Sequence, residues 1–136
     1  MSIADHRILT VNSETTVADV SKKMLDEDVR NLFVVKDGKP IGVVRDIDIV
    51  FKVVARDLNP NRVRAEQITL SPAPILDHKA RVLDAARIMV EKRVRRILLM
   101  DREKIVGSVS AGDVLKELSY IPTGDNGETI KKLTQE

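Results

Sequence analysis

The chain has 136 residues, 43% of them hydrophobic, with 23 basic residues, 21 acidic residues and no cysteine. This length predicts one compact unit, and no apolar run is long enough for a membrane span, so no membrane association is expected. Disulfides and thiolate metal sites are excluded, and the lack of a signal-peptide pattern at the N-terminus predicts a cytoplasmic location. Because both signs of charge are interspersed and the net charge is +2, nucleic acid is a poorly supported partner.

The same pattern occurs twice along the chain, with a constant offset of 65 residues and no gap. Gly42 matches Gly107, and Asp48 matches Asp113. Neither half is long enough to bury much apolar surface alone, so the two are expected to share a core, with any site in the clefts between them. The further matches are Val17 with Val82, Asp19 with Asp84, Met24 with Met89, Val29 with Val94, Arg30 with Arg95, Lys39 with Lys104 and Val44 with Val109.

Each half has the pattern of a short strand, a helix, two strands joined by a turn, and a second helix. In the first half, residues 8–9 form the short strand, and apolar residues at helical spacing follow over residues 17–25. Residues 32–35 are a continuous apolar run, which is typical of a strand covered on both faces. A tight turn at residues 37–38 then leads into a strand over residues 41–44.

The closing helix of the first half, over residues 47–55, has apolar side chains on more than one face. This is more than a single packed face requires, so we expect the additional face to contact another subunit in a homodimer. Its counterpart around Val114, Leu115 and Leu118 carries Lys116 and Glu117 and has the pattern of a helix with one apolar face.

The second half repeats this order after an extended, proline-containing segment at residues 71–74. A helix is expected over residues 82–90 and strands over residues 97–100 and 105–109. We therefore predict a first repeat at residues 1–66, a second at 67–120 and a peripheral C-terminal tail at 121–136.

A strand containing Gly107 leads into Ser110, and Asp113 follows at the start of a helix. The Asp113 carboxylate can accept hydrogen bonds from both hydroxyls of a ribose, and Ser110 with the free N–H groups of the helix start can bind a phosphate. Glycine at 107 and 112 allows a ligand to approach the backbone. The same residues also form a capping box, with Ser110 as N-cap and Asp113 at N3, and Ser110 can serve in both roles.

The first half carries the same pattern with Arg45 in place of the hydroxyl residue and Asp48 as its acid. Two interpretations follow: this site is empty, or Arg45 reaches a phosphate held in the neighbouring cleft. Three further arginines, Arg30, Arg95 and Arg96, directly precede or begin the central strands, and the guanidinium group suits bidentate phosphate recognition. The alternative for these three is ion pairing with Asp26, Asp28 and Glu91 on the preceding helices.

Each half thus has a strand, a turn, a second strand with a glycine, and then a hydroxyl residue, or Arg45 in the first half, followed three positions later by Asp. This duplicated pattern resembles the CBS motif, here as a stand-alone tandem pair from about Ile8 to Leu118. The resemblance implies an α+β fold of two β-α-β-β-α repeats, in which small sheets pack against helices about a pseudo-twofold axis. It also implies a regulatory module that binds an adenosyl ligand, with AMP or ATP ahead of S-adenosylmethionine or NAD. The ribose and phosphates would contact the residues named above, and adenine would lie near Ser71, Pro74 and Ile97.

A catalytic constellation is not evident in the sequence. The only histidines, His6 and His78, have no neighbouring metal ligands, so neither a metal site nor an obligatory cofactor is expected. Asp46 and Asp48 lie at a helix start, where carboxylates offset the helix dipole. We therefore expect a sensor for an unknown effector protein and no enzyme. The alternatives are a structural dimerisation module without ligand and a nucleic-acid-associated regulator.

Overall fold

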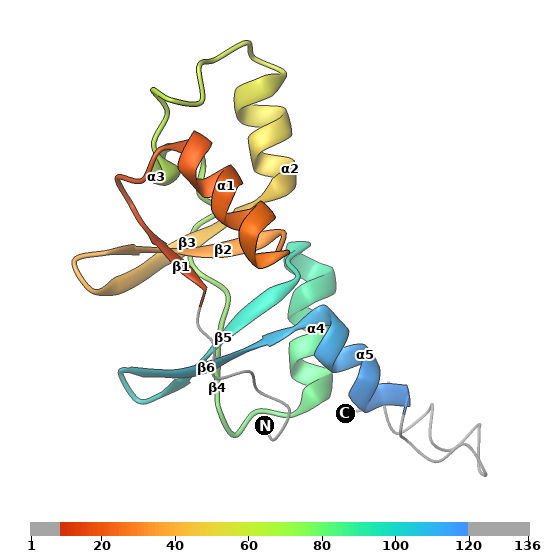
Figure 1. Cartoon of the computed structure of the whole chain (residues 1–136). Helices are drawn as coiled ribbons and strands as arrows, with labels where there is room; N and C mark the ends of the chain where they lie inside the picture. The colour runs from red at the N-terminus through yellow and green to blue at the C-terminus, as the bar shows by residue number, and fades with distance from the viewer. Residues whose placement is uncertain (1–8, 120–136) are drawn as a thin grey trace.

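The structure is a computed structural model that describes residues 9–119 (Figure 1). Two units of strand, helix, two strands and helix follow one another, with a short extra helix between them. This order confirms the α+β class and the two β-α-β-β-α repeats. The elements are β1 (Thr10–Asn12), α1 (Val17–Glu27), β2 (Asn31–Lys36), β3 (Lys39–Arg45), α2 (Asp46–Ile49), the π-helical segment η1 (Val50–Val54), α3 (Ala65–Ile68), β4 (Ile75–Asp77), α4 (Val82–Lys92), β5 (Arg96–Asp101), β6 (Lys104–Ser110) and α5 (Ala111–Ser119).

Each repeat builds one three-stranded sheet, ordered β1-β2-β3 in the first and β4-β5-β6 in the second. The outer strands β1 and β4 run parallel to the central strands, whereas β3 and β6 form antiparallel hairpins with them. The registers match at the 65-residue offset: Thr10 lies opposite Phe33, and Ile75 lies opposite Leu98. The duplication in the sequence is thus a duplication in strand pairing.

The first helix of each repeat ends at a residue with a left-handed backbone conformation. α1 begins after Thr16, whose hydroxyl accepts the Asp19 N–H at 3.2 Å, and it ends at Asp28 with φ 53°. α4 ends in the same way at Arg93, with φ 54°. These two left-handed residues reverse the chain into β2 and β5, and the arginines at both strand starts lie close together where the repeats meet.

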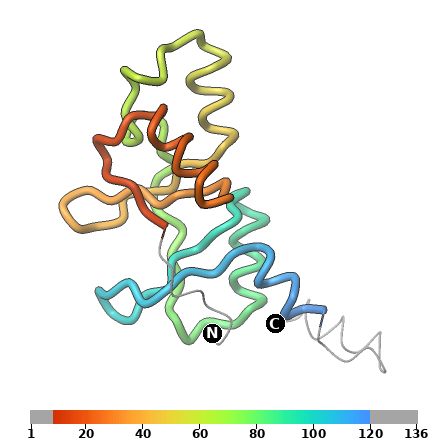
Figure 2. The backbone as a smooth tube through the Cα atoms, viewed as in Figure 1, coloured from red at the N-terminus to blue at the C-terminus, as the bar shows by residue number. Residues whose placement is uncertain are grey.

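The two repeats lie against each other (Figure 2), and they share their core, as the sequence predicts. Leu32 and Val34 of β2 pack into the cluster of the first repeat, together with Val17 and Val20 of α1. Phe33, which points to the opposite face of the same strand, is fully buried in the cluster of the second repeat with Ile97. The central strand β2 is therefore covered on both faces.

Two details of chain order differ from the sequence predictions. The first strand begins at Thr10, so Leu9, which was expected in it, is buried just ahead of it; Ile8 lies outside the described residues. The short helix α3 was not predicted, and it spans the predicted boundary between residues 66 and 67. Its first N–H groups bond back to the carbonyls of Thr15 and Ser13, at 2.8 and 3.0 Å, which ties α3 to the first repeat. The predicted tail at 121–136 lies outside the described residues.

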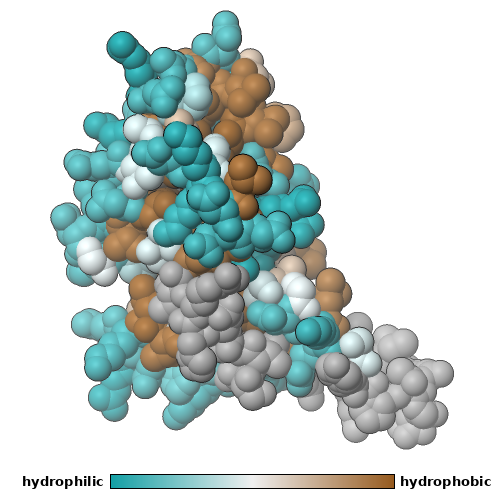
Figure 3. Space-filling model, in the orientation of Figure 1, coloured by the Kyte–Doolittle hydropathy of each residue, from teal (hydrophilic) through white to brown (hydrophobic). Residues whose placement is uncertain are grey.

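Large apolar side chains are exposed on α2 and η1, where Phe51 and Val54 are each 66% accessible (Figure 3). The sequence prediction of an additional apolar face on this helix is confirmed. The counterpart α5 was predicted to have one apolar face. This is only partly right, because Leu115 on α5 is exposed. Leu25 and Val90, at equivalent positions of α1 and α4, are exposed as well, although their helical spacing placed them with the core residues.

Candidate functional site

A polar cleft of about 290 Å³ opens where the two repeats meet. Residues 28–31 of the first repeat line one side, and Arg95, Arg96 and residues 110–112 of the second repeat line the other. These segments are the start of β2, the start of β5, and the junction of β6 with α5. Four of the predicted site residues, Arg30, Arg95, Arg96 and Ser110, thus come together in one cleft.

Backbone hydrogen bonds fix the walls of this cleft. The N–H of Ala111, the first residue of α5, donates to the Arg95 carbonyl at 2.8 Å. The N–H of Arg95 donates in turn to the side-chain oxygen of Asn31 at 2.8 Å, which joins the two repeats. Asn31 is buried, with 2% exposure, and was not singled out by sequence reasoning. The only sequence signal for it is its position beside Arg30 at the start of a central strand.

Ser110 and Asp113 form the reciprocal capping box at the start of α5. The Asp113 N–H donates to Ser110 Oγ at 3.1 Å, and the Ser110 N–H donates to Asp113 Oδ2 at 3.2 Å. Within residues 9–119, Asp113 Oδ1 has no hydrogen-bond partner. Capping therefore occupies one carboxylate oxygen and leaves the other available as an acceptor.

Three arginines from the two repeats and one acidic residue, Asp28, line the cleft, so its charge is mainly positive. Arg30 and Arg95 are exposed, and the N-terminus of the nine-residue helix α5 adds the positive end of its dipole. The nearest carboxylate pairing of Arg30 is long, 4.0 Å from Nη1 to Asp46 Oδ2, with the Arg30 side chain 69% exposed. An exposed pair of this length is weak, so Arg30 can turn toward an anion in the cleft.

In the first repeat, Arg45 and Asp48 form a bidentate ion pair. Arg45 Nε donates to Asp48 Oδ2 at 2.9 Å, and Arg45 Nη2 donates to Oδ1 at 2.7 Å. The Asp48 carboxylate also accepts the Arg45 backbone N–H at 2.9 Å, and Lys52 Nζ lies 3.2 Å from Oδ1. The Asp48 side chain is 2% exposed and the Arg45 side chain 14%.

These contacts determine the ionisation of the pair. Burial alone would raise the pKa of Asp48, but the hydrogen bonds from Arg45 and Lys52 together outweigh it and hold that pKa below its usual value. The hydrogen bond to Asp48 raises the pKa of Arg45 despite its partial burial. Both groups are therefore charged near neutral pH.

The three residues expected near adenine do not line the cleft. Ile97 is fully buried in the shared core. Pro74 is buried, and its carbonyl accepts the Leu98 N–H at 2.9 Å. Ser71 is exposed, and its hydroxyl donates to the Ile41 carbonyl at 2.9 Å.

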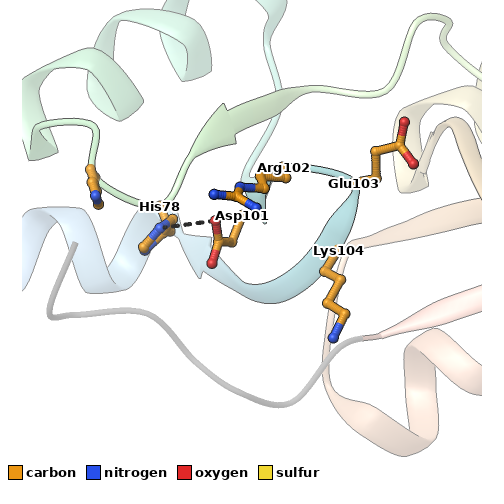
Figure 4. A pocket seen from close by; sticks show the side chains of 6 residues that line it. His78, Asp101, Arg102, Glu103 and Lys104 are labelled. Carbon is orange, nitrogen blue, oxygen red and sulfur yellow. Dashed lines mark ion pairs between the residues drawn. The ribbon is translucent and has the colours of Figure 1, made fainter.

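A larger, open hollow of about 1010 Å³ lies at the turn between β5 and β6, away from the motif residues (Figure 4). Charges of both signs line it, and His78 Nε2 lies 3.7 Å from Asp101 Oδ1. Among the described residues, no three potential metal ligands come together. His6 lies outside the described residues.

The CBS domain family model matches residues 1–55 and again residues 65–120. An uncharacterised protein of Methanopyrus kandleri is 28% identical over 136 residues, which is 98% of this chain and 69% of that protein. An uncharacterised protein of Methanocaldococcus jannaschii is 30% identical over 111 residues, 79% of this chain and 60% of that protein. The chain thus spans about two thirds of the length of these relatives.

Solved structures show the same arrangement. A conserved protein from Pyrococcus horikoshii has a TM-score of 0.75 at 26% identity, covering 89% of this chain and 91% of that one. A hexameric CBS-CP12 protein from bloom-forming cyanobacteria has a TM-score of 0.72 at 28% identity, covering 84% and 67%. The chain belongs to the CBS domain family and contains a tandem pair of these domains. Among the described residues, no helix has the length and apolar character needed to cross a membrane.

Proposed function

We propose that this CBS-domain pair is a regulatory module that binds an adenine nucleotide in the cleft between its repeats. AMP or ATP is favoured over S-adenosylmethionine or NAD, because phosphates match the positive charge of the cleft. The observation that supports the proposal most directly is the convergence of Arg30, Arg95 and the start of α5 on one small cleft. These groups come from both repeats, so an anion between them would link the repeats.

The ligand groups can be assigned to residues by their chemistry. The phosphates would bind Arg30, Arg95, Arg96 and the Ser110 hydroxyl, through charge-assisted hydrogen bonds. Asp113 would accept a ribose hydroxyl on Oδ1 while Oδ2 keeps its capping bond to Ser110. The cleft volume of about 290 Å³ is just below the range of about 300–1000 Å³ for small-molecule sites, which suits a ribose phosphate better than a whole nucleotide.

The adenine base therefore requires space beyond this cleft. Of the three residues proposed to contact adenine, Ile97 and Pro74 are buried in the described chain, and Ser71 is exposed. We infer that adenine reaches them only when the two repeats shift relative to each other. Binding would then favour one relative orientation of the repeats and change the surface offered to an effector protein, which is a conformational mechanism of regulation.

The exposed apolar face supports assembly into a homodimer. Val50 of η1 and its counterpart Leu115 of α5 are 51% and 67% exposed, and patches of such residues on soluble proteins commonly mark interfaces. Oligomers occur in the family, as the hexameric cyanobacterial relative shows. Because the exposed residues lie on helices of both repeats, a dimer through this face would respond to their orientation.

The test is titration of the whole chain with AMP, ATP, S-adenosylmethionine and NAD by calorimetry and thermal denaturation. A ligand at 100 times its dissociation constant adds about 2.7 kcal/mol, which corresponds to a melting shift on the order of 10 °C for this size. Asp113→Asn retains a capping oxygen but loses the charge, so it should weaken affinity with little change in unliganded stability. Arg95→Ala should weaken affinity about tenfold or more.

Arg62→Ala is the matched control for the arginine substitution. Arg62 is exposed in the loop before α3 and lies outside the cleft. Its removal changes the net charge equally and should leave affinity unchanged. If none of the four ligands shifts the melting temperature at millimolar concentration, the ligand-binding proposal is wrong, and a structural dimerisation module becomes the better account.

A further inference from the structure

The 65-residue offset predicts a second cleft, related to the first by the pseudo-twofold axis. The first cleft lies between the end of α1 and the start of α5, and its counterpart lies between the end of α4 and the start of α2. In the counterpart, Arg45 takes the position of Ser110, and Arg93 takes the position of Asp28. The two positions can therefore be compared residue by residue.

The Arg45 guanidinium spans the counterpart position. Beyond its two bonds to Asp48, its Nη1 donates to the Arg93 carbonyl at 3.4 Å, so one side chain joins the start of α2 to the end of α4. A carbonyl at a helix C-terminus lies at the negative end of the dipole, which favours a cation there. At the corresponding position of the first cleft, Ser110 has a short side chain and the cleft stays open toward Asp28.

The acids of the two motifs also differ. Each oxygen of Asp48 has two donors, the Arg45 N–H and Nε on Oδ2 and Arg45 Nη2 and Lys52 on Oδ1, so no acceptor site is left for a ribose hydroxyl. The counterpart of Lys52 in the second repeat is Glu117, which cannot pair with Asp113. Asp113 thus keeps a free oxygen, and Asp48 does not.

We propose that Arg45 is a built-in occupant of the second cleft, so that each chain binds one nucleotide at the Ser110 cleft. This inference rests on the proposed function for the identity of the ligand. The Arg45 charge is already neutralised by Asp48 inside the protein, so a ligand gains little from it and would have to displace a buried, bidentate pair. Arg45 is therefore a specificity-determining residue that makes a duplicated module bind asymmetrically.

The test measures binding stoichiometry by calorimetric titration of AMP and of ATP into wild type and Arg45→Ser. Wild type should bind one nucleotide per chain. Arg45→Ser restores the hydroxyl-x-x-Asp pattern, in which the hydroxyl can accept the Asp48 N–H. It leaves each Asp48 oxygen with one donor, the residue 45 N–H on Oδ2 and Lys52 on Oδ1, so each oxygen can accept one further hydrogen bond. This variant should bind two nucleotides per chain, with the affinity of the first site unchanged within about twofold.

The converse substitution, made at Ser110, keeps the test valid if Arg45→Ser folds poorly. Ser110→Arg places an arginine three residues before Asp113 and should close the open cleft, reducing nucleotide affinity at least tenfold. Circular dichroism of both variants checks that the fold is retained. Two nucleotides per wild-type chain, one per chain in wild type and Arg45→Ser alike, or weaker first-site binding in Arg45→Ser would each overturn the proposal.

The outcomes also separate this inference from the proposed function. If wild type binds no nucleotide but Arg45→Ser binds one, the proposed site at Ser110 is wrong and the role of Arg45 is supported. If neither protein binds, both proposals are wrong.

Discussion

The side-chain oxygen of Asn31 accepts a 2.8 Å hydrogen bond from the backbone N–H of Arg95, 64 residues further along the chain. Arg95 in turn accepts the first N–H of α5 on its carbonyl at 2.8 Å. One buried amide of the first repeat thus positions the phosphate side of the cleft in the second. This contact joins the two repeats at the centre of the candidate site.

Asn31→Ala should destabilise the chain because it leaves the Arg95 N–H without its acceptor. Loss of the acceptor for this partly buried backbone donor should cost about 1 kcal/mol, measurable by urea denaturation. Asn31→Asp retains an acceptor oxygen and should recover much of this stability. Asn61→Ala, at an exposed loop position, controls for removal of an amide. Equal stability of Asn31→Ala and wild type would show that the contact does not join the repeats.

The ion pair of Asp48 should make stability depend on acid pH. Its folded pKa lies below the unfolded value of about 3.9, so the unfolded chain binds the proton more readily. The stabilisation is complete above about pH 4 and is lost as the pH falls through the folded pKa. Asp48→Asn should therefore reduce stability at neutral pH, by about 3 kcal/mol, and flatten its decline in acid.

Denaturant titrations from pH 7 to pH 2 measure this effect. Asp26→Asn, at an exposed position on α1, controls for the removal of one carboxylate. A slope in acid that is the same for Asp48→Asn and wild type would contradict the assignment.

Gly42→Ala should be destabilising because the backbone of another segment lies against this glycine. A Cβ atom at residue 42 would overlap Thr69 Cγ2 and the Leu70 carbonyl oxygen, where Leu70 bridges to Val43. Overpacking of this kind typically costs about 1–3 kcal/mol. Gly112→Ala is the matched control, since its Cβ would lie 3.7 Å from Ser110 Oγ, an ordinary contact. Thermal denaturation should separate the two variants by several degrees.

Phe51→Glu should disrupt the proposed homodimer. Phe51 is 66% exposed on η1, and a charge at that position cannot be buried in an apolar interface without a large desolvation cost. Light scattering at micromolar concentration should give the mass of two chains for wild type and one chain for the variant. Arg62→Glu, on the loop before α3, should remain dimeric. A monomeric wild type would show that this face does not mediate self-association.

Much of the fold could be predicted from the sequence, because its signals are local. The apolar runs beginning at Leu32 and Ile97 are too short for helices and too continuous for half-exposed strands, so they had to be covered on both faces. The duplication then required equivalent strand pairing in each half. Ser110 and Asp113 could be identified for the same reason: a capping box and a hydroxyl-x-x-Asp motif depend only on residues within one turn.

The tertiary structure decided what depends on contacts between distant segments. Helical spacing placed Leu25 with the core, but which face of α1 is covered depends on the neighbouring elements, and Leu25 is exposed. Asn31 begins β2, and nothing in the local sequence indicates that its side-chain amide contacts the backbone of Arg95. Arg45 has a long, flexible side chain whose direction is set by available partners, so only the buried Asp48 and the Arg93 carbonyl at the end of α4 fix it across the second cleft. Sequence therefore determined the two equivalent repeats, and long-range packing made their sites unequal.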